Sequence, residues 1–471
     1  MYKLHLILKY LRKRRIAWVS LIAVMLCTAM VLVVISVMGG WLRMFRESFH
    51  GLSGDVIVKG RSLTGFPHYE EVLAGIRQLP EVEAAVPTIR TYGLIHIAVD
   101  GDPKNAIRDG VQVLGIPINE MGKVNDFPKS TYRQYQKHIE QGRAPPTTAP
   151  SFDLLDDVPY EAIAGENARD WPGMIVGVGV VGLKKERDGT MERPPQLYTS
   201  WASLTTMGVA ADSPTVEAGA KTVKRYWIVD DSRTQIWQYD SNTVYVDFNV
   251  LQKDLGMEPY EGEPARASDI QIKVKPGADL AAVKEKVQGI VDSVTMRPDY
   301  PVGHPVIVET WLEANKQWLG AVEKETALVT FLFGMISIVA IFLIFCIFYM
   351  IVVEKTKDIG IIKSVGATST GVAGIFLGYG MAIGVVGGLM GLLVSYFIVK
   401  YINEIHTGMG EMLGLTIWDP EVYAFDTIPN TMDTETVIWI VGVAIVSSIL
   451  GALVPAIRAA RMNPVEALRW E

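Results

Sequence analysis

Long apolar runs at both ends of the chain flank one long polar stretch. Four runs are almost free of charged residues: 16–38, 326–353, 370–399 and 436–457. Each is long enough to cross a hydrocarbon core of roughly 30 Å as a helix. The pattern therefore predicts four membrane-spanning helices.

Residues 39–325, between the first and second runs, have a different character. Prolines, glycines and charges are spread throughout, and no apolar run is long enough to span a membrane. Helical periodicity covers 68–78 and 280–294. Short alternating or apolar runs predict strands at 55–59, 94–99, 111–115, 243–247 and 270–274. We therefore expect a membrane α-helical protein with a large α+β domain inserted between its first two spans.

The distribution of charge predicts the topology. Lysines and arginines occur in 1–15, in 354–369 and in 458–471, whereas Tyr401 to Glu435 carries acidic residues but no Lys or Arg. Because cytoplasmic loops are enriched in Lys and Arg, these three basic segments are predicted to be cytoplasmic. The polar domain 39–325 and the loop 400–435 are then extracytoplasmic. A cleaved signal peptide is disfavoured because the first apolar run is too long and no small-residue cleavage site follows it.

Composition narrows the class of protein. The formal net charge of −7 and the 49% hydrophobic content argue against a nucleic-acid binder and for a membrane protein. The two cysteines, Cys27 and Cys346, both lie in apolar runs, which excludes a disulfide framework.

No stretch of the sequence carries a catalytic constellation. The segment 360–364 lacks the spacing of a phosphate-binding loop, and 100–102 starts like a calcium loop but lacks the later ligands. The acidic pairs 156–157 and 230–231 are expected to be solvated. We therefore predict a non-catalytic protein that holds no metal.

Glycines recur every four residues in the third apolar run. Gly380, Gly384 and Gly388 share this spacing, which lets helix backbones approach closely in lipid. Two interpretations are open: packing within the chain, or an interface with a second, similar subunit.

The segment 354–369 is charged and lies between two apolar runs. Five polar residues are followed by Ile359, Ile361 and Ile362, which we expect to expose an apolar cluster before Gly366. This pattern predicts a short amphipathic helix along the membrane that ends at Gly366. A plain surface loop would not need three isoleucines, so the pattern favours a surface that docks a partner.

Several of these stretches resemble a known family. Residues 354–367, reading EKTKDIGIIKSVGA, resemble the coupling segment of FtsX-like, MacB-type ABC transporter permeases. Residues 455–471 resemble that family's C-terminal signature. Further stretches are similar to the lipoprotein-releasing LolC/LolE branch: 310–319 with 323–325, 425–429, 172–177 and 239–246.

The resemblance implies an inner-membrane permease that pairs with a second permease subunit, identical or paralogous, and docks a separate ABC ATPase. The chain has no Walker motif, so ATP and Mg²⁺ would be used by that partner and no cofactor would bind directly. ATP-driven closure would be relayed mechanically to the outer domain. The docking residues would be Glu354, Lys355, Thr356, Lys357, Asp358, Ile359, Gly360, Ile361, Ile362, Lys363 and Gly366.

The lipoprotein-releasing branch hands acylated proteins from the membrane to a periplasmic carrier. By this resemblance, the substrate would enter near the outer ends of the first two spans. The candidates there are Trp41, Met44, Phe45, Trp311 and Trp318. An aromatic belt at the membrane interface is the alternative for these residues.

The outer domain departs from the family pattern across 123–207, which is longer than usual and contains no recognisable carrier-docking hook. Two other functions therefore stay open: a MacB-like efflux permease that works with an outer adaptor, and an FtsX-like regulator of a cell-wall hydrolase.

Overall fold

The computed structural model describes residues 15–97, 106–146, 149–183, 191–209, 216–234, 236–260, 262–414, 427–463 and 465. Four stretches discussed above lie outside these ranges: the basic segment before residue 15, residues 100–102, residues 415–426 of the acidic loop and most of the tail after 463. The chain forms two compact units: a helical unit from the parts before residue 45 and after residue 319, and an α+β unit from residues 45–319.

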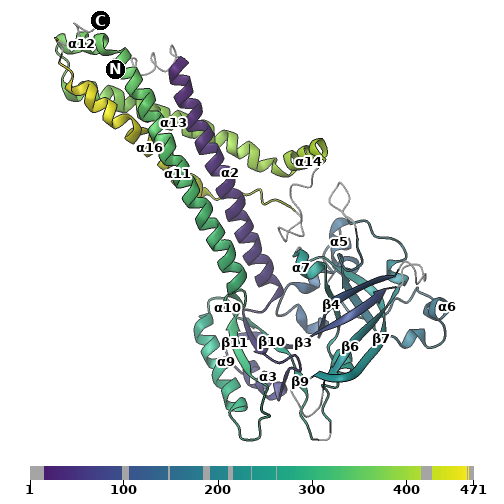
Figure 1. The fold of residues 1–471 in the computed structure, drawn as a ribbon. Coiled ribbons are helices and arrows are strands. Elements are labelled where there is room, and N and C mark those ends of the chain that lie inside the picture. The colour runs from purple at the N-terminus through teal and green to yellow at the C-terminus, as the bar shows by residue number, and fades with distance from the viewer. Residues whose placement is uncertain are drawn as a thin grey trace. The chain divides into compact units, whose positions relative to one another are not determined.

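Four long helices dominate the helical unit (Figure 1). They are α2 (Arg15–Leu52), α11 (Lys316–Glu354), α13 (Ser369–Lys400) and α16 (Thr434–Arg461). Each contains an apolar stretch long enough to cross a membrane. The helices α2 and α11 extend well beyond the predicted spans, because helical hydrogen bonding continues into the polar flanks.

Two short helices follow or separate the long ones. The helix α12 (Thr356–Ser364) lies between α11 and α13, in the segment predicted to be a short amphipathic helix. The helix α14 (Ile402–Leu413) comes directly after α13 and ends at Gly414, whose φ of +65° suits glycine. The region 400–435 is predicted to be a loop, so α14 is an addition to the predicted architecture.

The α+β unit is built on a nine-stranded sheet in the order β11-β1-β10-β3-β4-β8-β5-β7-β6. Most neighbours are antiparallel, but β4–β8 and β5–β7 are parallel. The long strand β3 joins the two halves: its first part pairs with β10 and its second part with β4. The strands are β1 (Val56–Gly60), β3 (Val82–Ile97), β4 (Ile107–Ile116), β5 (Gly173–Gly177), β6 (Trp201–Val209), β7 (Val216–Ser232), β8 (Thr243–Asp247), β10 (Asp269–Val274) and β11 (Val306–Thr310); β2 (Phe66–Pro67) and β9 (Arg266–Ala267) form a separate pair.

Alternation along the strands builds the main core of this unit. Val56, Val58, Ile270 and Ile272 point to one face of the sheet and are fully buried there. Apolar faces of three helices contribute to the same core: α3 (Tyr69–Arg77), α8 (Phe248–Asp254) and α9 (Leu280–Thr295). Both predicted helices of this unit and the predicted strands are confirmed, the strand at 94–99 as far as residue 97, after which the chain lies outside the described residues. The strands β5, β6, β7 and β11 are additions to the predicted architecture.

The prediction that the pair 230–231 is solvated is wrong. Asp230 and Asp231 lie near the end of β7 and are fully buried. Asp230 accepts hydrogen bonds from the backbone N–H groups of Arg133 and Gln134, at 2.7 and 3.0 Å. Asp231 binds the guanidinium of Arg193, with the closest contact at 2.9 Å. Burial and the neighbouring Asp231 raise the pKa of Asp230 to about 6.

Candidate functional site

The C-terminal end of α12 is fixed by a glycine. Gly366 has a φ of +105°, which a residue with a Cβ atom rarely adopts. Its N–H donates to the carbonyl of Lys363, and the N–H of Ala367 donates to the carbonyl of Ile362, both at 3.1 Å. These two bonds form a Schellman motif, which satisfies carbonyls at the end of the helix. The predicted end of the helix is confirmed.

One face of α12 packs against the ends of three long helices. Ile359 is 3% exposed and lies in a cluster with Val352 of α11, Val372 of α13 and Ala459 of α16. The hydroxyl of Thr356, also buried, donates to the carbonyl of Val353 at 2.8 Å. The expectation that all three isoleucines are exposed is therefore wrong for Ile359. It points inward because the ends of three helices converge on that side.

A lysine ties α12 to α16. The ammonium of Lys363 donates to the carbonyls of Ala460 and Met462, at 2.8 and 2.6 Å. Both carbonyls belong to the C-terminal end of α16, where free carbonyls and the helix dipole favour a positive charge. These two hydrogen bonds attach α12 to the end of α16.

The opposite face of α12 is open. Lys357, Ile361 and Val365 follow one another at intervals of four residues, so they lie on one side of the helix. Ile361 is 52% exposed and Val365 is 84% exposed. Gly360 is buried and Ile362 is half-buried, whereas Asp358 forms an ion pair with Lys355 on the same helix. Of the predicted docking residues, Lys357 and Ile361 present the clearest surface to a partner.

The predicted glycine row of α13 faces α16. A Cβ atom on Gly380 would lie 2.7 Å from the Cβ of Ala452, and one on Gly384 would lie 2.9 Å from the Cα of Ile445. Gly388 faces the same helix with a looser contact of 3.5 Å. Close packing of α13 on α16 within the chain therefore accounts for these three glycines.

A second row of glycines on α13 faces α2. A Cβ atom on Gly387 would lie 2.9 Å from the side chain of Val24, and one on Gly391 would lie 2.8 Å from that of Thr28. The sequence showed this spacing but not its direction. Both rows are used inside the helical unit.

The aromatic candidates on α2 and α10 (Trp311–Ala314) differ in accessibility. Phe45 is 3% exposed and stacks on Phe49 with ring centroids 4.2 Å apart. Trp311 is half-buried, with its ring 4.8 Å from that of His50. Phe45 therefore acts in packing and offers little surface to a substrate.

Three further candidates lie on the long helices. Trp41 and Met44 of α2 are half-buried. Trp318 lies in the first turn of α11, and its side chain is outside the described residues. Trp41 and Met44 are thus the candidates that the helical unit leaves partly accessible.

The helical unit contains an apolar cavity of about 250 Å³. Its wall includes Val31 and Ile35 from α2, Phe333 from α11, and Trp439 and Val443 from α16. Five of the sixteen lining residues carry a hydroxyl group, but the surface that lines the cavity is mostly apolar, so the cavity can hold an aliphatic group. No local sequence pattern predicts this cavity, because its walls come from helices far apart in the chain.

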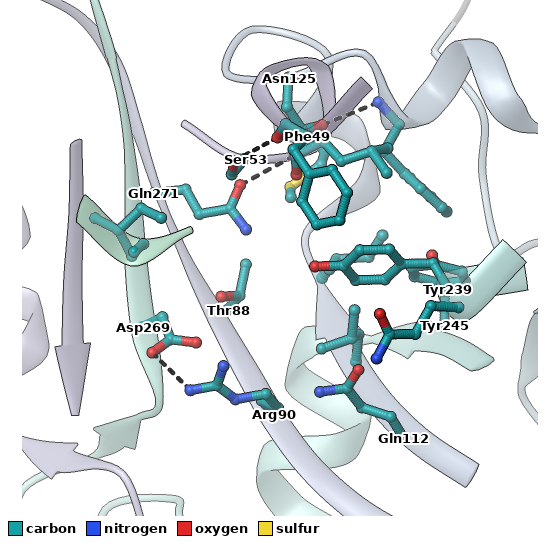
Figure 2. Close-up of a pocket in the computed structure, with 18 of the residues that line it drawn as sticks. Phe49, Ser53, Thr88, Arg90, Gln112, Asn125, Tyr239, Tyr245, Asp269 and Gln271 are labelled. Atoms are coloured by element: carbon teal, nitrogen blue, oxygen red, sulfur yellow. Dashed lines mark hydrogen bonds and ion pairs between the residues drawn. The ribbon is translucent and has the colours of Figure 1, made fainter. Parts of the chain in front are cut away.

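The α+β unit contains a larger, polar pocket of about 490 Å³ (Figure 2). Its floor is the face of the sheet opposite the main core. Thr88 and Arg90 of β3, Gln112 of β4, and Asp269 and Gln271 of β10 point to this side because they alternate with the core residues. The pocket is therefore a direct product of strand alternation.

Two interactions organise the walls of this pocket. Arg90 pairs with Asp269 at 3.3 Å, and burial raises the pKa of this carboxyl while Arg90 lowers it in part. Asn125 donates to the carbonyl of Leu52, the last residue of α2, at 2.9 Å and to the side chain of Gln271 at 3.0 Å. The end of α2 is thereby attached to the sheet.

The family profile for the MacB-like periplasmic core domain matches residues 17–290, and that for the FtsX-like permease C-terminal region matches residues 330–464. The lipoprotein-releasing system transmembrane protein LolC of Xylella fastidiosa strain Temecula1 is 22% identical over 477 residues, covering 98% of each chain. LolC of Neisseria meningitidis serogroup B is 24% identical over 472 residues, again covering 98% of each chain.

Two partial matches involve MacB. The macrolide export ATP-binding/permease protein MacB of Hahella chejuensis is 26% identical over 211 residues, which is 43% of this chain and 27% of that protein. The crystal structure of the periplasmic region of MacB from Actinobacillus actinomycetemcomitans is 6% identical over 59% of this chain and 98% of that one. Its TM-score of 0.30 is too low to argue a shared fold.

Proposed function

Because the chain belongs to the family of ABC transporter permeases with a MacB-like periplasmic core domain and an FtsX-like permease region, we propose that it relays the ATP hydrolysis of a separate ATPase to extracytoplasmic work. It is a multi-pass membrane protein of the inner membrane in this proposal. The α+β unit then lies outside the cytoplasm, inserted between the first and second spans, and α12 faces the cytoplasm.

The observation that carries this proposal is the two-sided structure of α12. Its outer side offers Lys357, Ile361 and Val365 to a partner. Its inner side is attached to the helix ends by Ile359 and by the hydrogen bonds of Lys363. A helix that can be contacted on one side and is fixed on the other transmits a push, which a free surface loop does not.

The partner of α12 is proposed to be an ABC ATPase on a separate chain, which binds the ATP and Mg²⁺. A second permease subunit, identical or paralogous, would complete the transporter. The permease itself would then bind no cofactor. The glycines of α13 that face α2 and α16 are occupied by packing within the chain, so the second subunit would contact other surfaces.

The docking claim is tested by introducing a charge on the outer side of α12. Ile361→Asp and Val365→Asp should each abolish co-purification of the ATPase, since an apolar contact would be replaced by a carboxylate that must be desolvated. Both side chains are exposed, so the permease should still reach the membrane. Val302→Asp is the matched control, because Val302 is 94% exposed in the α+β unit. Retention of the ATPase by both α12 variants would refute docking at this face.

Lipoprotein release is the work that we propose for this permease, with a periplasmic carrier as the acceptor. The two LolC relatives align over 98% of the chain, whereas the MacB relative aligns over 43%. The apolar cavity among α2, α11 and α16 supports an acylated substrate, because its lining suits an aliphatic chain.

Photo-crosslinkers distinguish this substrate from the alternative. Probes at Trp41 and at Ile35, which lines the cavity, should capture acylated protein during ATP turnover. A probe at Ile438, which is 67% exposed on α16 and does not line the cavity, is the control. Capture of unmodified peptides or small molecules alone would contradict lipoprotein release and favour an efflux function.

A further inference from the structure

The short helix α14 has a strongly segregated surface. At 3.6 residues per turn, its five large apolar residues fall within an arc of roughly 100°. These residues are Ile402, Ile405, Met409, Met412 and Leu413. Glu404, Thr407 and Glu411 lie on the opposite side. A helix of this kind normally buries its apolar side.

The apolar side of α14 is not buried within the described part of the chain. Met412 is 87% exposed and Leu413 is 57% exposed, and Ile405 and Met409 are also exposed. The helix leaves the group of long helices at the end of α13 (Figure 1). Its twelve residues give a length of about 18 Å, which is too short to cross a membrane.

The residues just before α14 indicate where the membrane ends. Tyr396, Phe397 and Tyr401, at the end of α13, are each about half-exposed. The ammonium of Lys400 lies 5.9 Å from the ring centroid of Tyr396 and 5.4 Å from that of Tyr401. Aromatic rings with a lysine beside them are typical of the headgroup level of a bilayer. Since α14 begins one residue after Tyr401, it starts at that level.

A side-chain clamp fixes the rotation of α14. The amide of Asn403 donates to the carbonyl of Ile428 at 3.0 Å, and its oxygen accepts the N–H of Ile428 at 2.9 Å. Asn403 lies on the side of the helix between the apolar and the acidic residues. The apolar side is thereby held facing away from the segment that leads into α16.

We infer that α14 lies flat in the boundary between headgroups and hydrocarbon, in the leaflet where α13 ends, and that lipid covers its apolar side. The continuity with the membrane-spanning surface of α13 identifies lipid as the occupant. With Glu404 and Glu411 on the polar side and no Lys or Arg in the helix, attraction to anionic headgroups is absent. The contact is therefore apolar, and it should form on a zwitterionic bilayer without anionic lipid.

Spin labels on single cysteines test this placement in the full-length protein. The chain has two native cysteines, Cys27 and Cys346, so a cysteine-free background needs two substitutions. Nitroxides are then attached at Ile405→Cys or Met409→Cys on the apolar side. Thr407→Cys on the polar side is the matched control. The protein is reconstituted in phosphatidylcholine nanodiscs, and collision rates with oxygen and with a neutral, water-soluble nickel chelate are measured.

The labels at 405 and 409 should collide several-fold more with oxygen than with the nickel chelate, and the label at 407 should show the reverse. Addition of phosphatidylserine should not increase this contrast, because Glu404 and Glu411 repel anionic headgroups. Equal exposure to the nickel chelate on both sides would overturn the inference, because it would place α14 in water. Low collision rates with both reagents at 405 and 409 would also overturn it, since a protein surface would then cover the apolar side.

Discussion

The attachment of α12 to α16 through Lys363 leads to a quantitative prediction. Lys363→Met keeps most of the side-chain volume but removes both hydrogen bonds to the carbonyls of Ala460 and Met462. Hydrogen bonds from charged groups contribute roughly 1.5–3 kcal/mol each. Lys363 is half-buried and water can replace part of this interaction, so the loss is about 2 kcal/mol for the pair.

This loss should appear as easier local opening of α12. At 1.36 kcal/mol for each factor of ten, about 2 kcal/mol corresponds to a roughly 30-fold increase in the opening equilibrium. Hydrogen exchange of the backbone amides in Thr356–Gly366, measured by mass spectrometry in nanodiscs, should accelerate by a similar factor. Exchange in the α+β unit should not change, because the substitution touches only the helical unit.

Lys357→Met is the control for this experiment. Lys357 lies on the outer side of the same helix, and no hydrogen bond or ion pair involves its side chain in the described structure. The Lys357→Met substitution should leave hydrogen exchange in α12 unchanged while it weakens docking of the ATPase. If Lys363→Met had no more effect on exchange than Lys357→Met, Lys363 would not anchor α12. Transport assays then add a second contrast. The Lys363→Met variant should retain the ATPase, but ATP hydrolysis should drive less transport than in the wild-type protein.

Two further predictions concern packing and pH. Gly384→Ile should lower the free energy of unfolding by about 1–3 kcal/mol, because the new side chain would overlap α16. Gly374 has open space around it, so Gly374→Ala should be neutral or stabilising. Thermal unfolding in detergent, monitored by tryptophan fluorescence, measures both variants, and equal midpoints would contradict the prediction. For Asp230, burial raises the pKa from 3.8 to about 6, so the folded state holds the proton more tightly than the unfolded state. The stability that proton binding at Asp230 contributes is therefore largest below pH 4 and is lost as the pH rises through 6. The free energy lost over this interval is about 3 kcal/mol. Wild-type stability relative to Asp230→Asn should decline over this interval, and parallel pH profiles of the two proteins would refute the assignment.

Much of the architecture follows from local patterns in the sequence. Apolar run length predicts the four long helices, because a bilayer admits only segments whose backbone bonds are satisfied internally. Alternation predicts the positions of β1, β4, β8 and β10, since side chains in a strand point to opposite faces. Gly366 predicts the end of α12, because few other residues adopt its positive φ. In each case a short stretch contains the physical cause.

Other features depend on contacts that no short stretch contains. Ile359 and Ile361 are chemically identical and two residues apart, yet one is buried and the other is half-exposed. The difference arises because the ends of α11, α13 and α16 converge on one side of α12. Asp230 and Asp231 have the local sequence of a solvated pair, and they are buried because groups distant in the chain bind both carboxylates.

The sequence by itself determined the positions of the four apolar helices, the α+β character of residues 39–325 and the short helix between the second and third runs, but not how far α2 and α11 continue into their polar flanks. Only the tertiary structure decided which side of α12 is open, which helices the glycines of α13 contact and where the two cavities lie. Secondary structure follows from hydrogen bonding and side-chain period within a few residues. The direction in which a side chain points depends on neighbours that the fold brings from elsewhere in the chain.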